Sequence, residues 1–178
     1  MAAKKLLTIG KIVLFLFAGA MFVNYAWCSL QLKNSLRVLE SIESGVYDDL
    51  SLAIYCFNPG YFLLIPITTT DDLISGYCDY IAVISADDLM EHLGAFKQLK
   101  KADLAPVLWK SAYVDLRVCY VLKSVKNGTL LEVAMFPGDS TFVNGIEVRE
   151  NDYLYDLILP FLPEEGGIEW PAFTNRKK

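Results

Sequence analysis

The single histidine of the chain, His92, follows acidic residues at helical spacing. Asp88 precedes it by four residues and Glu91 by one. Residues four apart lie on one face of a helix, so Asp88, Glu91 and His92 are the candidate metal ligands of this sequence. Acids near a helix start are also stabilised by the helix dipole, which explains them without a ligand. We therefore predict no bound metal and no cofactor.

A small exported hydrolase or metal-dependent enzyme that uses His92 and nearby acids is the alternative function. A Ser–His–Asp or Cys–His arrangement would depend on His92, yet no serine or cysteine lies in a nucleophile-elbow motif. The phosphate-binding patterns G-x-x-x-x-G-K and G-x-G-x-x-G do not occur in the sequence either. We predict no catalytic residue and interpret the chain as non-enzymatic.

Three cysteines, Cys56, Cys78 and Cys119, belong to the part of the chain that we expect to fold as a domain. An odd number allows at most one internal disulfide, and an exported domain would meet an oxidising compartment. Cys56 and Cys119 lie in strongly apolar stretches, so they also fit as small buried side chains. The sequence does not choose the pair.

A charge-free run over residues 12–32 is the main organising feature of the chain. Its 21 residues contain no Asp, Glu, Lys, Arg or His. As a helix it reaches roughly 30 Å, the thickness of a bilayer's hydrocarbon core. We predict that residues 1–32 are a signal anchor, or transmembrane segment, that meets the membrane through residues 12–32. Cleavage, which would secrete the domain, and a buried helix of a soluble protein are the alternatives.

Charge on the two sides of this run predicts the orientation. Lys4, Lys5 and Lys11 precede it, whereas all 21 acidic residues follow it. The positive-inside rule then places the N-terminus in the cytoplasm and the C-terminal domain outside the cell membrane, in a single pass. From residue 33 onward, 13 basic and 21 acidic residues give a formal charge of −8. That charge disfavours nucleic acid as a partner.

Residues 33–45 continue the helical pattern beyond the apolar run. Leu32, Leu36 and Leu39 follow one another at steps of four and three residues, and Gly45 is placed to end the helix. This membrane-proximal helix either packs one face on the domain or forms a short coiled-coil neck. In the second case the protein is a homodimer that associates through these three leucines.

Residues 46–163 are predicted to form one α+β domain with a largely antiparallel sheet and two to three helices, before a flexible tail over residues 164–178. Two apolar strands over residues 50–57 and 61–68 flank the turn Asn58-Pro59-Gly60. A third strand precedes a helix over residues 85–101, and residues from Asn151 or Asp152 to Leu159 form the last helix.

Two Asn-Gly pairs predict hairpins, because both residues tolerate the positive φ of a type I′ turn. Closing the first hairpin at Asn127-Gly128 pairs Lys123 with Glu132, so that opposite charges meet. Asn144-Gly145 closes a second, shorter hairpin over residues 141–148.

The predicted function is a membrane-anchored extracytoplasmic domain that binds a protein or small ligand of unknown identity. The enzyme that uses His92 and the dimerising structural or assembly protein are the alternatives.

Overall fold

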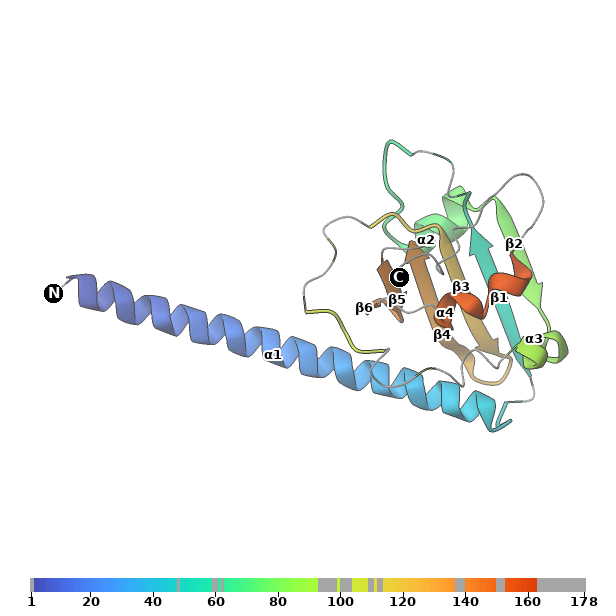
Figure 1. Cartoon of the computed structure of the whole chain (residues 1–178), viewed down its shortest axis with the longest axis horizontal. Coiled ribbons are helices and arrows are strands. Elements are labelled where there is room, and N and C mark those ends of the chain that lie inside the picture. The colour runs from blue at the N-terminus through green and yellow to red at the C-terminus, as the bar shows by residue number, and fades with distance from the viewer. Residues whose placement is uncertain are drawn as a thin grey trace, which may run out of the picture.

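A long N-terminal helix and an antiparallel sheet form the protein, which confirms the predicted α+β class (Figure 1). The computed structural model describes residues 2–47, 49–58, 61, 63–92, 99, 104–108, 111, 114–136, 140–149 and 153–162. The elements are α1 (Ala2–Glu43), β1 (Leu50–Cys56), α2 (Thr70–Asp72), a π-helical turn (Leu73–Tyr77), β2 (Tyr80–Ile84), α3 (Ala86–His92), β3 (Val118–Ser124), β4 (Gly128–Phe136), β5 (Ser140–Val143), β6 (Ile146–Val148), α4 (Tyr153–Asp156) and a 3-10 turn (Leu159–Phe161). The strands form one sheet in the order β2-β1-β3-β4-β5-β6.

Helix α1 runs without a break through the predicted boundary at residue 32, so the apolar segment and the membrane-proximal helix are one helix. Gly45 ends it, as predicted, with φ 72°. The Gly45 N–H donates to the Ile42 carbonyl at 3.0 Å and the Val46 N–H donates to the Ser41 carbonyl at 3.1 Å. This is a Schellman motif, in which glycine adopts the left-handed conformation at no steric cost.

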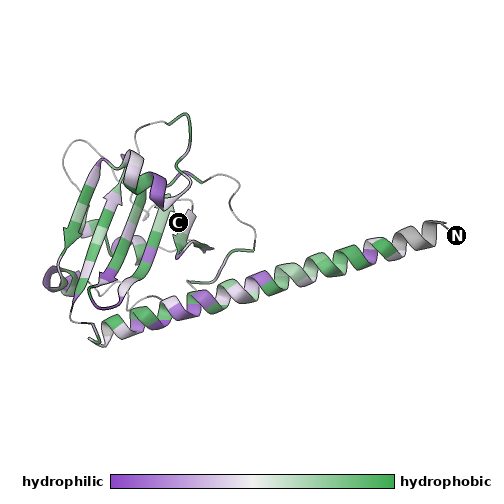
Figure 2. Cartoon of the chain, turned by 180° about the vertical axis from the view of Figure 1, so that it is seen from behind, coloured by the Kyte–Doolittle hydropathy of each residue, from purple (hydrophilic) through white to green (hydrophobic). Residues whose placement is uncertain are grey.

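The two halves of α1 have different surroundings. Over residues 8–20 every side chain is exposed, although the segment is strongly apolar. From Met21 onward, the side chains that are buried or half-buried recur at steps of four and three residues. That stripe is Met21, Tyr25, Cys28, Leu32, Ser35, Leu39 and Ile42. Figure 2 shows the same change as green, apolar ribbon in the free half and more purple beside the sheet.

Leu32 and Leu39 are each 2% exposed because they belong to the chain's own hydrophobic core, and Leu36 packs against that core. The membrane-proximal helix therefore packs one face on the domain, as the first of the two interpretations predicted. A homodimer through these leucines stays a prediction, and it would require the helix to leave the domain.

The two faces of the sheet are covered to different extents. The covered face carries Leu52, Ile54, Tyr120 and Val133, which pack with residues of α1, α3 and α4 in the main core. The Tyr120 hydroxyl donates to the Leu154 carbonyl at 2.9 Å, and this bond ties the sheet to α4.

The opposite face, which we call the open face, carries the side chains that alternate with these. Only part of it is covered, by the segment around Ile67 and Leu73. On strand β2 at its edge, Ile81 and Val83 are 58% and 73% exposed.

The hairpin between β3 and β4 corrects the predicted register. Lys123 pairs with Thr129, and Glu132 lies opposite Val121 instead. Three residues, 125–127, separate the paired Ser124 and Gly128, and a bulge follows between Leu122 and Lys123. The cause is Ser124, whose Oγ accepts hydrogen bonds from the backbone N–H of Asn127 at 3.2 Å and from its side-chain amide at 3.1 Å. Asn127 thus keeps a negative φ, which excludes a type I′ turn.

The hairpin between β5 and β6 confirms its prediction, because Asn144 and Gly145 have φ values of 49° and 74° and Val143 pairs with Ile146. The Asn144 side chain also joins three elements. Its Oδ1 accepts the Glu132 N–H at 2.9 Å, and its Nδ2 donates to Ser35 Oγ of α1 at 2.9 Å. The predicted turn therefore also holds the helix against the sheet.

The predicted strand over residues 61–68 is wrong for the described residues of that range, none of which belongs to a strand. Both edges of β1 are already occupied, by β2 on one side and β3 on the other, so no third strand can pair with it. Leu64 and Ile65 are 93% and 73% exposed. Of the predicted helix over residues 85–101, α3 is described to His92, and residues 93–98 lie outside the described residues.

The last predicted helix is shorter than expected. Helix α4 covers Tyr153–Asp156 and a 3-10 turn follows over Leu159–Phe161. Its expected caps at Asn151 or Asp152, and the predicted tail, lie outside the described residues.

Candidate functional site

The three candidate metal-ligand residues, Asp88, Glu91 and His92, lie in α3, but they do not converge on a common point. The Ser85 hydroxyl donates to the Asp88 carboxylate at 2.8 Å, so that this acid belongs to the helix cap. Glu91 is exposed, and the half-buried His92 ring packs edge-on against Phe161 with 4.9 Å between centroids. Within the part of the chain that the structure describes, no group of three His, Cys, Asp or Glu side chains could hold a metal ion.

The cysteines are free thiols in the structure. Cys56 and Cys119 lie on neighbouring strands, but Cys56 belongs to the core of the covered face and Cys119 to the cluster of the open face. Side chains on opposite faces of a sheet cannot form a disulfide. Of the three pairs that the prediction of at most one disulfide left open, only the two that contain Cys78 remain. The Cys78 thiol donates to the Tyr80 carbonyl at 2.9 Å.

Alkylation should separate these thiols by burial. Burial raises the pKa of Cys56 far above its ordinary value and, with the nearby Glu132 charge, raises the pKa of Cys119 to about 12. Since the thiolate is the reactive form, we expect N-ethylmaleimide at pH 8 to modify the half-buried Cys78 in the folded chain. Cys56 and Cys119 should react only after denaturation. Peptide mass mapping measures this, with Cys78→Ser as the control; modification of Cys119 as fast as that of Cys78 would contradict the burial.

A hollow of about 260 Å³ opens on the open face of the sheet. Its apolar lining comes from Leu116, Ala134 and Phe142, and Glu132 adds a half-buried carboxylate. The segment 68–70, three successive threonines, lines the hollow from above the sheet.

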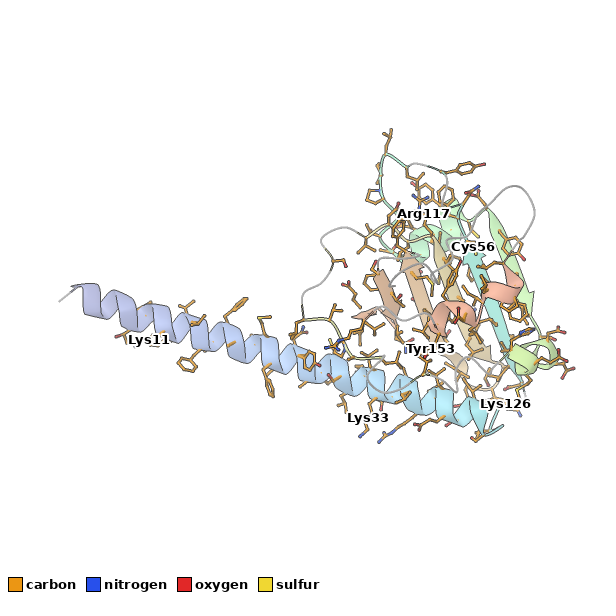
Figure 3. The ribbon with its side chains drawn as sticks, in the orientation of Figure 1. Lys11, Lys33, Cys56, Arg117, Lys126 and Tyr153 are labelled. Carbon is orange, nitrogen blue, oxygen red and sulfur yellow. The ribbon has the colours of Figure 1, made fainter. Side chains whose placement is uncertain are left out.

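A buried ion pair fixes the segment that forms this lining. Asp115 and Arg117 pair with side chains that are only 8% and 5% exposed. Asp115 Oδ1 accepts the Ile67 N–H at 3.0 Å, and the Leu116 N–H donates to the Ile67 carbonyl at 2.7 Å. The Arg117 guanidinium lies over the Phe57 ring, 4.9 Å from its centroid. Figure 3 places Arg117 at the end of the sheet remote from α1.

The threonine segment is also capped at its end. Thr69 Oγ accepts the Asp72 N–H at 3.1 Å as the N-cap of α2, and its hydroxyl donates to the Asp72 carboxylate at 2.6 Å. The rim of the hollow is therefore held at both ends, at Ile67 and at Thr69. A site of this kind is largely formed before a ligand binds, which lowers the ordering cost of binding.

The sequence did not single out these residues as a site. Glu132 was assigned to a cross-strand pair with Lys123, and Thr68 to the end of the predicted strand over residues 61–68. The one available signal was the charge of Glu132 in a largely apolar strand, on the face that it shares with Lys123 in the predicted register. The neighbours that complete the hollow, Leu116 and Phe142, come from segments far apart in sequence.

A second concave region lies where α1 meets the domain. A hollow of about 100 Å³ is lined by Tyr25, Leu32 and Leu36 of the helix and by residues 104–106. A smaller one, of about 40 Å³, lies between residues 106–108 and Met21, Asn24, Tyr25 and Cys28 of α1. The segment 104–108 therefore lies beside the end of the charge-free run of the helix and beside Lys33 and Leu36, which follow it.

Comparison of the chain with protein-family models, with curated proteins and with solved structures finds no match.

Proposed function

We propose that the chain is a membrane-anchored, non-enzymatic binding domain held outside the cytoplasm. The observation that carries this proposal is the change along α1. The helix is long and apolar enough over Thr8–Ile42 to span a membrane, and the side chains of residues 8–20 are all exposed to the surroundings of the domain. A row of exposed Ile, Val, Leu and Phe is unfavourable in water and favourable in a bilayer.

The charge distribution supports the orientation. Lys4, Lys5 and Lys11 precede the exposed apolar stretch, and no acidic residue does. Lysines on this side are retained in the cytoplasm during insertion, so the domain is delivered to the other side. The buried stripe of α1 then attaches the domain rigidly to its anchor.

The hollow on the open face is the ligand site that we propose for this domain. A half-buried carboxylate, Glu132, over a floor of Leu116, Ala134 and Phe142 suits a ligand with one cationic group and one apolar group. The formal charge of −8 beyond residue 32 would attract such a ligand over a longer range.

The orientation is tested by labelling a chain with one reactive cysteine on the domain. In a Cys78→Ser background, Val125→Cys is suited because Val125 is 88% exposed in the β3–β4 hairpin. We expect a membrane-impermeant maleimide to label Val125→Cys on intact cells, and to label Ala2→Cys only after permeabilisation. Labelling of Val125→Cys that requires permeabilisation would place the domain in the cytoplasm.

The ligand site is tested with 2-phenylethylammonium as the probe and neutral 2-phenylethanol as its uncharged counterpart. We expect the cation to shift the NMR methyl signals of Ala134 and of residues 68–70 at lower concentration. Glu132→Gln should raise the Kd of the cation about tenfold, which corresponds to about 1.4 kcal/mol of binding free energy. Glu40→Gln, an exposed glutamate of α1, is the matched control. Equal binding of both probes, unchanged in Glu132→Gln, would remove Glu132 from the site.

A further inference from the structure

The free part of α1 is too short to cross a bilayer before the helix meets the domain. Helix α1 begins at Ala2, its apolar part begins after Lys5, and Met21 is the first residue that lines a hollow with the 104–108 segment, which leaves residues 6–20, 15 residues, before the domain. At about 1.5 Å per residue, these 15 residues reach about 22 Å, whereas the hydrocarbon core is about 30 Å thick. A bilayer around this helix must therefore extend to residues that already lie beside the domain.

The lysines limit where the crossing can begin. A span of about 20 residues that starts directly after Lys5 ends near Tyr25, and one that starts after Lys11 ends near Leu32. The second span would put residues 21–25 at the middle of the apolar layer and immerse much of the acidic domain. The first span therefore applies, with the Lys11 side chain extending to the near interface and residues 21–25 at the outer boundary. Because Pro106, Val107 and Leu108 line a common hollow with Met21, Asn24 and Tyr25, the 104–108 segment is held at the same depth.

The 104–108 segment has the properties that this depth requires. Its sequence is Leu-Ala-Pro-Val-Leu, without a charged or polar side chain, and Leu108 is 63% exposed. Backbone groups must also be paired where water is scarce. The Val107 N–H donates to the Glu147 carbonyl at 3.1 Å and the Arg149 N–H donates to the Ala105 carbonyl at 3.1 Å, so the segment extends the sheet beyond β6. Pro106 has no N–H to leave unpaired.

A buried carboxylate fixes the end of the segment. Glu147, 6% exposed, accepts hydrogen bonds from the Ser111 N–H at 2.9 Å and from the Ser111 hydroxyl at 2.5 Å. The segment is thus tied to β6 along its length and at Ser111. It is an apolar edge of the domain, hydrogen-bonded to β6, and Figure 1 shows it as the yellow segment that runs just above α1.

We propose that the 104–108 segment is a second membrane contact, immersed with Leu108 in the outer interface of the bilayer that α1 crosses. This inference rests on the proposed membrane crossing. The occupant of this surface is lipid, because the exposed Leu108 lies beside the membrane-length apolar part of α1 and at the depth that the helix imposes. The domain is then held with its β6 edge against the membrane rather than tethered at a distance.

The test is depth-dependent fluorescence quenching of single-cysteine variants of the full chain in phosphatidylcholine vesicles. Cys28→Ser and Cys78→Ser remove the accessible thiols, and Leu108→Cys carries an environment-sensitive label. Lipids with nitroxide groups at two depths are the quenchers. Leu14→Cys, in the exposed part of α1, reports the crossing itself. Leu64→Cys is the matched control, since Leu64 is an equally apolar, 93% exposed residue of the segment that Figure 1 shows on the side of the domain away from α1.

We expect quenching of the label at Leu108→Cys, at a depth about 15 Å from the bilayer centre, where the hydrocarbon core ends. The label at Leu14→Cys should be quenched more deeply, and the label at Leu64→Cys should not be quenched. If Leu14→Cys is quenched while Leu108→Cys behaves like Leu64→Cys, the second contact is wrong and the anchor stands. If Leu14→Cys is not quenched, the crossing itself is wrong, and the second contact is overturned with it.

Discussion

Asp115→Ala is expected to lower the free energy of unfolding by about 3–5 kcal/mol, the usual cost of leaving one partner of a buried ion pair uncompensated. The substitution leaves the Arg117 guanidinium buried without its carboxylate, and it also removes the acceptor of the Ile67 N–H. The measurement is urea unfolding of the full chain in detergent micelles, followed by near-ultraviolet circular dichroism. Because Ile67 leads into the threonine segment, the rim of the hollow should loosen as well.

A double substitution separates the cost of leaving Arg117 buried without its partner from the contribution of the ion pair itself. Asp115→Leu with Arg117→Met removes both charged groups and retains apolar volume, so it should recover much of the stability that Asp115→Ala loses. The Ile67 N–H remains without its acceptor in that variant, and a deficit of about 1–3 kcal/mol should persist. Full stability of Asp115→Ala would mean that the pair contributes nothing to the fold.

Leu39→Ala is expected to lower the free energy of unfolding by about 2–5 kcal/mol, the usual range for a leucine truncated in a core. Leu39 lies 2% exposed in the main core, although it belongs to the helix that leaves the domain. If α1 is attached to the sheet by its buried stripe, the cavity left by this substitution destabilises helix and sheet together. Urea unfolding in micelles measures the change.

Leu30→Ala is the matched control, because Leu30 belongs to the same helix and is 53% exposed. An exposed substitution of this kind should change the free energy of unfolding by no more than about 0.5 kcal/mol. Equal effects of the two substitutions would mean that α1 does not pack on the sheet in solution. Sedimentation of the same variants tests the homodimer, since dissociation in Leu39→Ala alone would assign the stripe to a second copy.

Local chemistry was sufficient for several elements. Gly45 ends α1 because a Schellman motif needs a residue that tolerates positive φ, and Asn144-Gly145 forms its turn because both residues do. Ser85 and Asp88 cap α3 through a bond between neighbouring residues. Each of these features depends on atoms within a few residues, so the sequence contains the information to predict it.

The Asn127-Gly128 hairpin shows where such reasoning fails. The dipeptide favours a type I′ turn, but the hydroxyl of Ser124 accepts two hydrogen bonds from Asn127 and selects a longer turn. A change of one or two positions in a strand register moves side chains to new partners. That shift placed Glu132 opposite Val121 rather than opposite Lys123, two residues along the same face of the sheet.

The sequence alone determined that the chain has a charge-free, membrane-length helix followed by an acidic α+β domain. Composition and periodicity suffice for this, because hydrophobic partitioning and helix length are additive along the chain. Only the tertiary structure decided which strands pair with β1, which leucines of α1 are buried, and which residues surround the hollow. Those outcomes depend on which of several distant segments pairs with a given edge of the sheet or packs on a given face. A local sequence pattern does not contain that information.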